Sequence, residues 1–297
     1  MNLTEGEVVF CLENLLKLTG AKDQIPKRGL PFLNAIILGF HMTFPFQNSI
    51  LMAEDPTKRH RPTMAEIKED MLSKRGGMCY TQNVFLYYLL QAIGYNVYFC
   101  PATVSTSVTN PYNHIVCLVK NVVTTDDVYL ADTACGYPTF TAVSMQFDKE
   151  SPVFKESFME YKFIRHEGKI LYMLGKGWFK PKIPLPFDLY IDGFRRFYSF
   201  ELQFISDLRQ FDDVFQNVYT LPELSPFHSN LRLISFPNKL ALIFVSNKMK
   251  TENGDHEFDC VTFDDNEDLL KSYLKHFPQL GEQTVRSAIK NWQLALK

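Results

Sequence analysis

The sequence lacks the features that mark several large classes of protein. It has no window of about twenty apolar residues, so it does not encode a membrane-spanning helix. It has no long basic run, and 31 basic side chains oppose 33 acidic ones, which argues against nucleic acid or an anionic membrane as a partner. No GxGxxG or P-loop motif follows a predicted strand, so neither of these nucleotide-binding folds is supported.

The six cysteines form no CxxC pair, and their spacing fits no zinc site or disulfide framework. The N-terminal residues have neither the basic segment nor the apolar stretch of an export signal. We therefore predict free thiols, a cytoplasmic location and no bound metal. Hydrophobic residues make up 46% of the chain and include 26 Phe, which predicts a globular protein with a core rich in aromatic rings.

Capping signals predict helices in the first third of the chain. Thr4 and Glu7 form a capping box before a helix predicted over residues 8–18, with Gly20 as its C-cap. Further helices are predicted over residues 32–41, 63–72 and 84–93. The last of these is apolar on nearly every face, which predicts a position at the centre of the molecule.

The pattern changes after Tyr95 to short runs rich in β-branched and aromatic residues. Strands are predicted over residues 96–100, 114–120, 128–132, 169–172, 197–204, 231–236 and 240–245, with an irregular connection over 181–186. Two final helices are predicted over residues 269–275 and 282–296. Helices followed by strands and then by a mixed segment indicate an α+β fold rather than alternating βαβ units.

Cys79 follows two glycines, Gly76 and Gly77, and begins the apolar helix. The glycines allow a sharp turn, and the first turn of a helix favours the reactive thiolate form of a cysteine. A cysteine in this position can instead be a small core residue. The Arg-Gly-Gly sequence before it favours a nucleophile.

His114 and Asp132 lie at the ends of two predicted strands. Asp132 follows an apolar run, where a carboxylate is costly to bury unless it is paired. Orienting a histidine and stabilising its imidazolium is one such pairing. Cys79, His114 and Asp132 thus describe a thiol-activation site, which proteases, transglutaminases and acyltransferases share, so the pattern alone does not select the reaction.

Several ordered segments resemble the arylamine N-acetyltransferases. Residues 75–83 (Arg-Gly-Gly-Met-Cys-Tyr-Thr-Gln-Asn) resemble the Arg-Gly-Gly-x-Cys signature of that family, with an Asn four residues after the Cys. Residues 45–48 (Pro-Phe-Gln-Asn) are similar to its Pro-Phe-Glu-Asn segment. His114 and residues 132–136 fall where the family has its triad His and its Asp-x-Gly-Phe-Gly loop.

The resemblance implies a three-part architecture around a cysteine-protease-like catalytic core. Residues 1–94 would form a helical bundle that carries the nucleophile. Residues 95–203 would form a β-barrel-like domain that carries the His and the Asp, and residues 204–297 an α/β lid.

The same resemblance implies a ping-pong reaction. Cys79 would take an acetyl group from acetyl-CoA and pass it to an arylamine, an arylhydrazine or a related amine. His114 would act as general base and acid, and Asp132 would orient it. Acetyl-CoA would be the donor and no cofactor would be bound permanently. The partners would then be two small molecules, with no nucleic acid and no membrane, while the oligomeric state stays open.

The resemblance also implies contacts to both substrates. Asn110, Tyr219 and Ser225 stand at positions similar to those that contact CoA in the family. Asn113 and Cys135 stand at positions expected to contact the acceptor.

The sequence departs from the family pattern at two places that bear on these contacts. Gln47 replaces the usual Glu, which removes a charge and keeps a hydrogen-bonding group. Ala134 and Cys135 replace the Gly-Phe pair, and the missing ring predicts a wider acceptor pocket.

Two other classes of function stay open at this point. One is an amide synthase, or a transferase that uses another acyl thioester such as malonyl or propionyl. The other is a catalytically idle binding protein on the same fold, against which the intact set of Cys79, His114 and Asp132 argues. A cysteine protease has only the generic order of the three residues in its favour.

Overall fold

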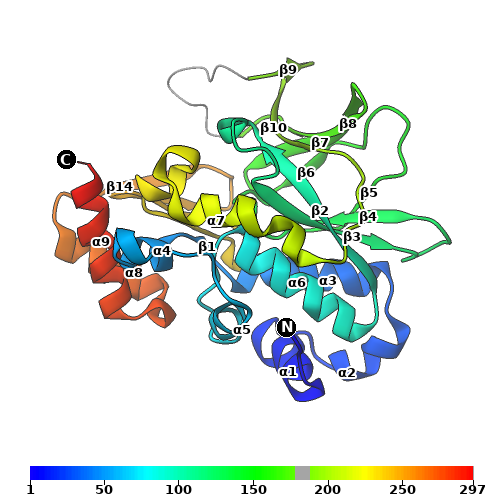
Figure 1. Cartoon of the computed structure of the whole chain (residues 1–297), viewed down its shortest axis with the longest axis horizontal. Coiled ribbons are helices and arrows are strands. Elements are labelled where there is room, and N and C mark those ends of the chain that lie inside the picture. The colour runs from blue at the N-terminus through cyan, green and yellow to red at the C-terminus, as the bar shows by residue number, and fades with distance from the viewer. Residues whose placement is uncertain (178–187, 297) are drawn as a thin grey trace.

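The computed structural model describes residues 1–177 and 188–296. The irregular connection predicted over residues 181–186 lies outside these ranges. Two antiparallel sheets form the frame, with helices packed around them (Figure 1). In the described part of the chain, no helix is both long and apolar enough to cross a membrane.

The helices gather in the first and last thirds of the chain. They are α1 (Glu5–Val9), α2 (Ala21–Gln24), α3 (Leu30–Thr43), α4 (Ser49–Ala53), α5 (Met64–Leu72), α6 (Cys79–Ile93), α7 (Asp212–Thr220), α8 (Asn266–His276) and α9 (Glu282–Ala295). Both predicted capping boxes are present, at Thr4 with Glu7 and at Thr63 with Glu66. The short helices α2 and α4 were not predicted as helices, because each is too brief to show a clear apolar period. Helix α7 was also missed, although Phe215, Val218 and Tyr219 form a buried apolar face at helical spacing.

The first helix ends earlier than predicted. After α1 the chain continues as a π-helix over Phe10–Leu15, in which the N–H of Leu16 donates to the carbonyl of Cys11, five residues back. Gly20 is not its C-cap, as the sequence had suggested. The helical segment ends at Leu16, which is followed by Lys17 in a left-handed conformation, and Gly20, with a φ of 67°, is the N-cap of α2.

The larger sheet carries the middle of the chain and curls as a half-barrel. Its strands are β2 (Asn96–Val104), β3 (His114–Lys120), β4 (Val128–Ala131), β5 (Val143–Ser144), β6 (Phe154–Glu156), β7 (Met159–His166), β8 (Lys169–Leu174), β9 (Tyr190–Ile191) and β10 (Phe194–Phe200). Their order is β5-β4-β3-β2-β10-β8-β7-β6, with β9 beside β10. The predicted strand 114–120 is confirmed at both ends, because its apolar run is unbroken and polar residues flank it.

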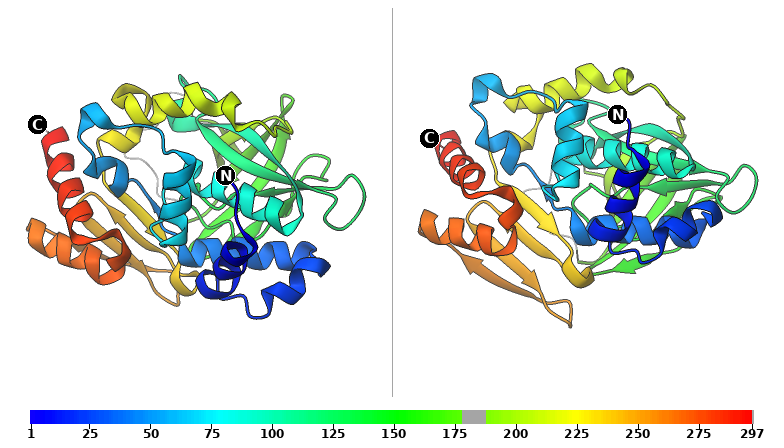
Figure 2. Two further views of the ribbon diagram at one scale, coloured as in Figure 1. Left: turned by 60° about the horizontal axis from the view of Figure 1, so that its bottom comes forward. Right: turned by 90° about the horizontal axis from the view of Figure 1, so that it is seen from below.

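The smaller sheet joins the two ends of the chain. Its strands are β1 (Phe46–Gln47), β11 (Arg232–Ser235), β12 (Leu242–Val245), β13 (Lys248–Glu252) and β14 (Phe258–Thr262), in that order. Helices α8 and α9 pack on this sheet at one end of the molecule (Figure 2). The N–H of Gln47 in β1 donates to the carbonyl of Gly77, so the turn before Cys79 is fixed to a sheet built mainly from the last third of the chain.

Helix α6 lies in the main core, as its apolar pattern predicted. Leu86, Leu89 and Leu90 are fully buried, and the helix packs on β2 and β3. Gly94 ends it with a φ of 95°, a left-handed conformation that favours glycine. The buried helix therefore holds its first residue, Cys79, in a fixed place beside the start of β3.

Candidate active site

A turn of two glycines positions Cys79. Gly76 has a φ of 69°, and a Cβ there would clash with the carbonyl oxygen of Pro45. A Cβ on Gly77 would lie 2.7 Å from the side chain of Thr81, in the first turn of α6. The Gln82 amide locks the turn by donating to the carbonyls of Pro45 and Gly77, at 2.9 Å each.

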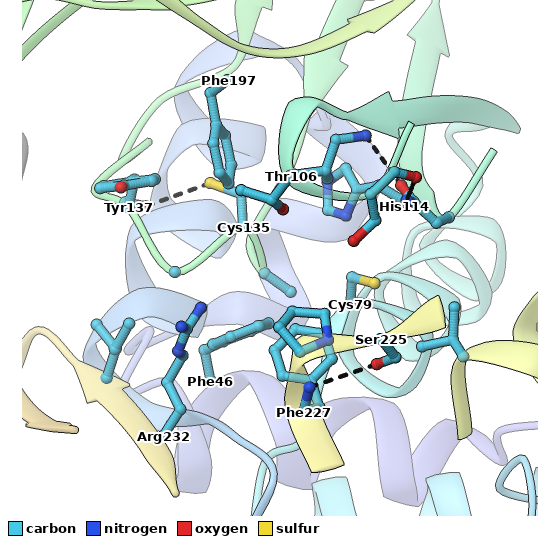
Figure 3. Close-up of a pocket in the computed structure, with 18 of the residues that line it drawn as sticks. Phe46, Cys79, Thr106, His114, Cys135, Tyr137, Phe197, Ser225, Phe227 and Arg232 are labelled. Carbon is cyan, nitrogen blue, oxygen red and sulfur yellow. Dashed lines mark hydrogen bonds between the residues drawn. The ribbon is translucent and has the colours of Figure 1, made fainter. Parts of the chain in front are cut away.

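Cys79, His114 and Asp132 meet where α6, β3 and β4 converge. Nε2 of His114 donates to Oδ2 of Asp132 at 2.8 Å, and both side chains are buried. The second ring nitrogen, Nδ1, is left for the thiol of Cys79, which also interacts with this imidazole. The three residues singled out in the sequence are thus brought together, and Cys79 and His114 line one cavity (Figure 3).

His114 and Asp132 each stabilise the charged form of the other. Burial is the largest single influence on His114 and acts to lower its pKa, but the charges and hydrogen bonds of Asp132 and Cys79 together outweigh it and raise that pKa to about 10. Burial likewise works against the carboxylate of Asp132, yet His114 and further hydrogen bonds hold its pKa below the usual value. A second histidine near Asp132, His41, is no rival base, because burial lowers its pKa to about 4.

Asn83 supports this group of side chains, a role that the sequence did not predict. Its side chain is fully buried and donates to Oδ1 of Asp132 at 2.9 Å and to the carbonyl of Ile115 at 2.7 Å. It accepts from the backbone and hydroxyl of Thr133 at 3.1 and 3.0 Å. Asn83 lies four residues after Cys79, one helical turn on, and this spacing was the only signal for it.

The cavity beside Cys79 has a volume of about 330 Å³. This size suits a small organic molecule rather than a peptide. Its wall is mostly apolar and aromatic, and Phe46, Tyr137, Phe158, Phe197 and Phe227 line it. Figure 3 shows Phe197, Cys135 and Tyr137 on one side of the space and Arg232, Phe46 and Phe227 on the other.

The residues predicted to contact substrates divide into two groups. Asn113, Cys135 and Ser225 line the cavity that holds Cys79. Asn110 is buried outside its wall, and its side-chain nitrogen has no hydrogen-bond partner among the described residues. The hydroxyl of Tyr219 lies 3.5 Å from that of Thr81 and lines a second cavity of about 280 Å³.

The departures from the family pattern also have clear places in the structure. The Gln47 side chain is buried, donating to the carbonyl of Arg75 at 3.3 Å and accepting from the N–H of Ile50 at 3.2 Å. Cys135 is 8% exposed, and its thiol lies 3.6 Å from the carbonyl of Tyr137. Within the described ranges, no group of three or more His, Cys, Asp or Glu side chains is arranged to hold a metal.

The fold is similar to solved arylamine N-acetyltransferases. The protein from Mycobacterium smegmatis superposes with a TM-score of 0.73 at 17% identity, over 94% of this chain and 97% of that one. The Salmonella typhimurium protein gives 0.74 at 17% identity, over 97% and 99%. The Mycobacterium marinum protein in complex with CoA gives 0.68 at 15% identity, over 92% and 98%. No curated protein sequence matches the chain.

These superpositions confirm the predicted α+β fold class with its cysteine-protease-like core. The sequence comparison is independent of them and covers most of the chain. A family model described as N-acetyltransferase matches residues 29–279. The chain is therefore an acyltransferase and belongs to the arylamine N-acetyltransferase family.

Proposed function

We propose that the protein transfers an acetyl group from acetyl-CoA to an arylamine, an arylhydrazine or a related amine. The observation that carries this proposal is the buried 2.8 Å bond between His114 and Asp132, beside a cysteine at the first turn of α6 that lines an apolar cavity. The superposition on a relative in complex with CoA supports the choice of donor.

The proposed reaction has two halves. In the first, the thiolate of Cys79 attacks the thioester carbon of acetyl-CoA, the bond to the CoA sulfur breaks, and CoA leaves with a proton from His114. In the second, the amine attacks acetyl-Cys79 and gives a proton to His114, and the bond to the Cys79 sulfur breaks. The amide leaves, and Cys79 and His114 return to their starting state.

Three features of the site support this chemistry. The interaction of Asp132 with Nε2 turns the other nitrogen of His114 toward Cys79, as a base that must shuttle one proton requires. The aromatic wall would shield the acetyl group from water until an amine enters. A reduced Cys79 is needed throughout, in keeping with the predicted cytoplasmic location.

The donor and acceptor contacts are proposed in the same way. Ser225 and Asn113 line the cavity and could contact the pantetheine arm and the acceptor, respectively. Asn110 and Tyr219 would contact CoA outside that cavity. No feature of the cavity calls for a permanently bound cofactor in this scheme.

The test is the mass of the intact protein after incubation with acetyl-CoA and no amine. We expect one added acetyl group, located on Cys79 by peptide mapping, and its release when an arylamine is added. Absence of the adduct, or its location on Cys117 or Cys260, would show that the proposed site is wrong. Acylation by a larger thioester alone would favour the alternative of a different acyl donor.

A further inference from the structure

The cavity holds an arginine whose charge no carboxylate balances. Arg232 lies on β11, and its side chain points from that strand into the cavity (Figure 3). Among the described residues, no Asp or Glu lines this cavity, and none pairs with the Arg232 guanidinium. The stretches outside the described part, residues 178–187 and Lys297, contain no Asp or Glu in the sequence.

The other ionic groups of the cavity are paired within the protein. Arg195 also lines it, but its Nη2 lies 2.6 Å from Oδ1 of Asp188. Asp132 does not line the cavity and is hydrogen-bonded to His114 and Asn83. Cys79 carries no charge once it holds an acyl group. At the stage when an acceptor enters, the guanidinium of Arg232 is therefore the one charged group of the described cavity wall that pairs with no described side chain.

Two aromatic rings lie close to this charge. The guanidinium of Arg232 lies 5.8 Å from the centre of the Phe227 ring, and its charge also acts on the phenol of Tyr137. Arg232 is half-buried, and burial lowers the pKa of its guanidinium. A cation–π contact does not use the planar fork of N–H donors, so the fork stays available to an acceptor that enters the cavity.

We propose, building on the acyl transfer proposed above, that Arg232 binds a carboxylate carried by the substrate in this cavity. A carboxylate matches the guanidinium fork in charge and in geometry. It could belong to an acceptor, such as an aminobenzoate, or to the acyl group, such as malonyl. The rings of Phe46 and Phe227 between Arg232 and Cys79 (Figure 3) suit the aryl ring of an acceptor.

The experiment compares 4-aminobenzoate with its neutral isostere 4-aminobenzamide, in wild type and in Arg232→Gln. We expect wild type to have the higher kcat/KM with 4-aminobenzoate. Arg232→Gln should lower the ratio of kcat/KM for 4-aminobenzoate to kcat/KM for 4-aminobenzamide by about 10- to 100-fold, the effect of losing a charged hydrogen bond. Arg232→Lys keeps the charge but loses the planar fork of donors, so its ratio of the two kcat/KM values should lie between those of wild type and Arg232→Gln. Binding of both compounds by calorimetry, without a donor, should show the same change.

Two further measurements identify the source of the anion. If malonyl-CoA acylates Cys79 faster than acetyl-CoA does, and Arg232→Gln reverses that order, the carboxylate belongs to the acyl group. Arg232→Gln could instead slow acetylation by acetyl-CoA but not by p-nitrophenyl acetate, and leave the preferences for 4-aminobenzoate and for malonyl-CoA unchanged. In that case the arginine binds the phosphates of CoA, and the proposal is wrong.

Stability separates a binding role from a structural one. Arg232 is half-buried and forms no ion pair with a described residue, so it should contribute little to the stability of the fold. We expect Arg232→Met to unfold at a temperature no lower than wild type does. A marked loss of stability in Arg232→Met, with equal ratios for the two acceptors, would overturn the proposal. Failure of acetyl-Cys79 to form at all would instead refute the proposed function, and the binding comparison would still test Arg232.

Discussion

Two walls of the cavity differ in how completely their polar groups are paired. The triad wall comprises Cys79 and His114, which line the cavity, together with Asp132 and Asn83, which are buried behind them. The recognition wall comprises Phe46, Cys135, Phe227 and Arg232. In the triad wall, Asp132 accepts from His114, Asn83 and the N–H of Ala134. In the recognition wall, the guanidinium of Arg232 has no side-chain acceptor among the described residues.

The difference in pairing indicates that the positions of the catalytic side chains are fixed before a substrate binds. A buried network that satisfies its own donors and acceptors resists change, because removing one member leaves the others unpaired. In the recognition wall, the aromatic rings and the guanidinium of Arg232 can form further contacts only with a bound ligand. We therefore expect changes in the triad wall to abolish the rate and changes in the recognition wall to alter selectivity.

The largest effect is expected at the nucleophile. Cys79→Ala should abolish acetyl transfer and the acetyl adduct, because no other side chain in the triad wall carries a thiol. The fold should survive, since the change removes one sulfur atom from the edge of a cavity. Circular dichroism and thermal unfolding provide the control. Transfer by Cys79→Ala at the wild-type rate would place the chemistry elsewhere.

Asp132→Asn should slow the reaction by about 10⁴-fold, because an amide holds the imidazole of His114 in the wrong tautomer. It should also lower the pKa of His114, which Asp132 and Cys79 together raise to about 10. Histidine NMR titration of both proteins measures this shift. A titration of His114 that Asp132→Asn leaves unchanged would contradict the pairing.

The same variant has a defined pH signature in stability. The folded pKa of His114 is raised from 6.5, so its contribution is complete below pH 6.5 and is lost as the pH rises toward 10. The pKa of Asp132 is lowered, so its contribution is complete above its ordinary value of 3.8 and is lost in acid. The difference in unfolding free energy between wild type and Asp132→Asn should be greatest from about pH 4 to 6.5.

Much of the triad wall could be predicted because its signals are local. Gly76 and Gly77 are needed by a turn with no room for side chains, and the apolar pattern of α6 fixes its burial. The order of helices and strands likewise gave the fold class. The role of Asn83 was not predicted, because its partners Asp132 and Thr133 lie about fifty residues away in sequence.

The recognition wall was harder to predict for the same reason. Arg232 lies in a strand of the smaller sheet, and nothing in the residues around it indicates that its side chain faces Tyr137 across a cavity. Likewise β1 is only two residues long, and it pairs with β11, a strand that lies nearly two thirds of the chain away in sequence. The boundaries proposed for three domains at residues 94 and 203 stay predictions.

Asn83→Ala should have the next largest effect. It removes two donors and an acceptor and leaves Asp132 and Thr133 with unpaired groups, each at a cost of about 1–3 kcal/mol. Displacement of Asp132 should then lower kcat by roughly 10²-fold. The KM for acetyl-CoA should change little, which a general loss of folded structure would not produce.

A control for this positioning role is Thr133→Val, which removes one hydroxyl contact to Asn83 and leaves Asp132 in place. It should cost stability without the fall in kcat. If both variants reduced kcat equally, the effect would come from disruption of the buried network rather than from the position of the carboxylate.

The smallest expected effect concerns Cys135, which stands where the family loop has a ring. Its thiol lines the cavity between Tyr137 and Phe197 (Figure 3), so a larger side chain there would reduce the space for the acceptor. Cys135→Phe should shift selectivity toward small arylamines, since one methylene of fit in an apolar pocket is worth about 1–3 kcal/mol. Cys135→Ala, which keeps the space open, should retain the wild-type order. The measurement is kcat/KM for amines graded by size, and equal selectivity in wild type and Cys135→Phe would show that the recognition wall does not contact the acceptor at this position.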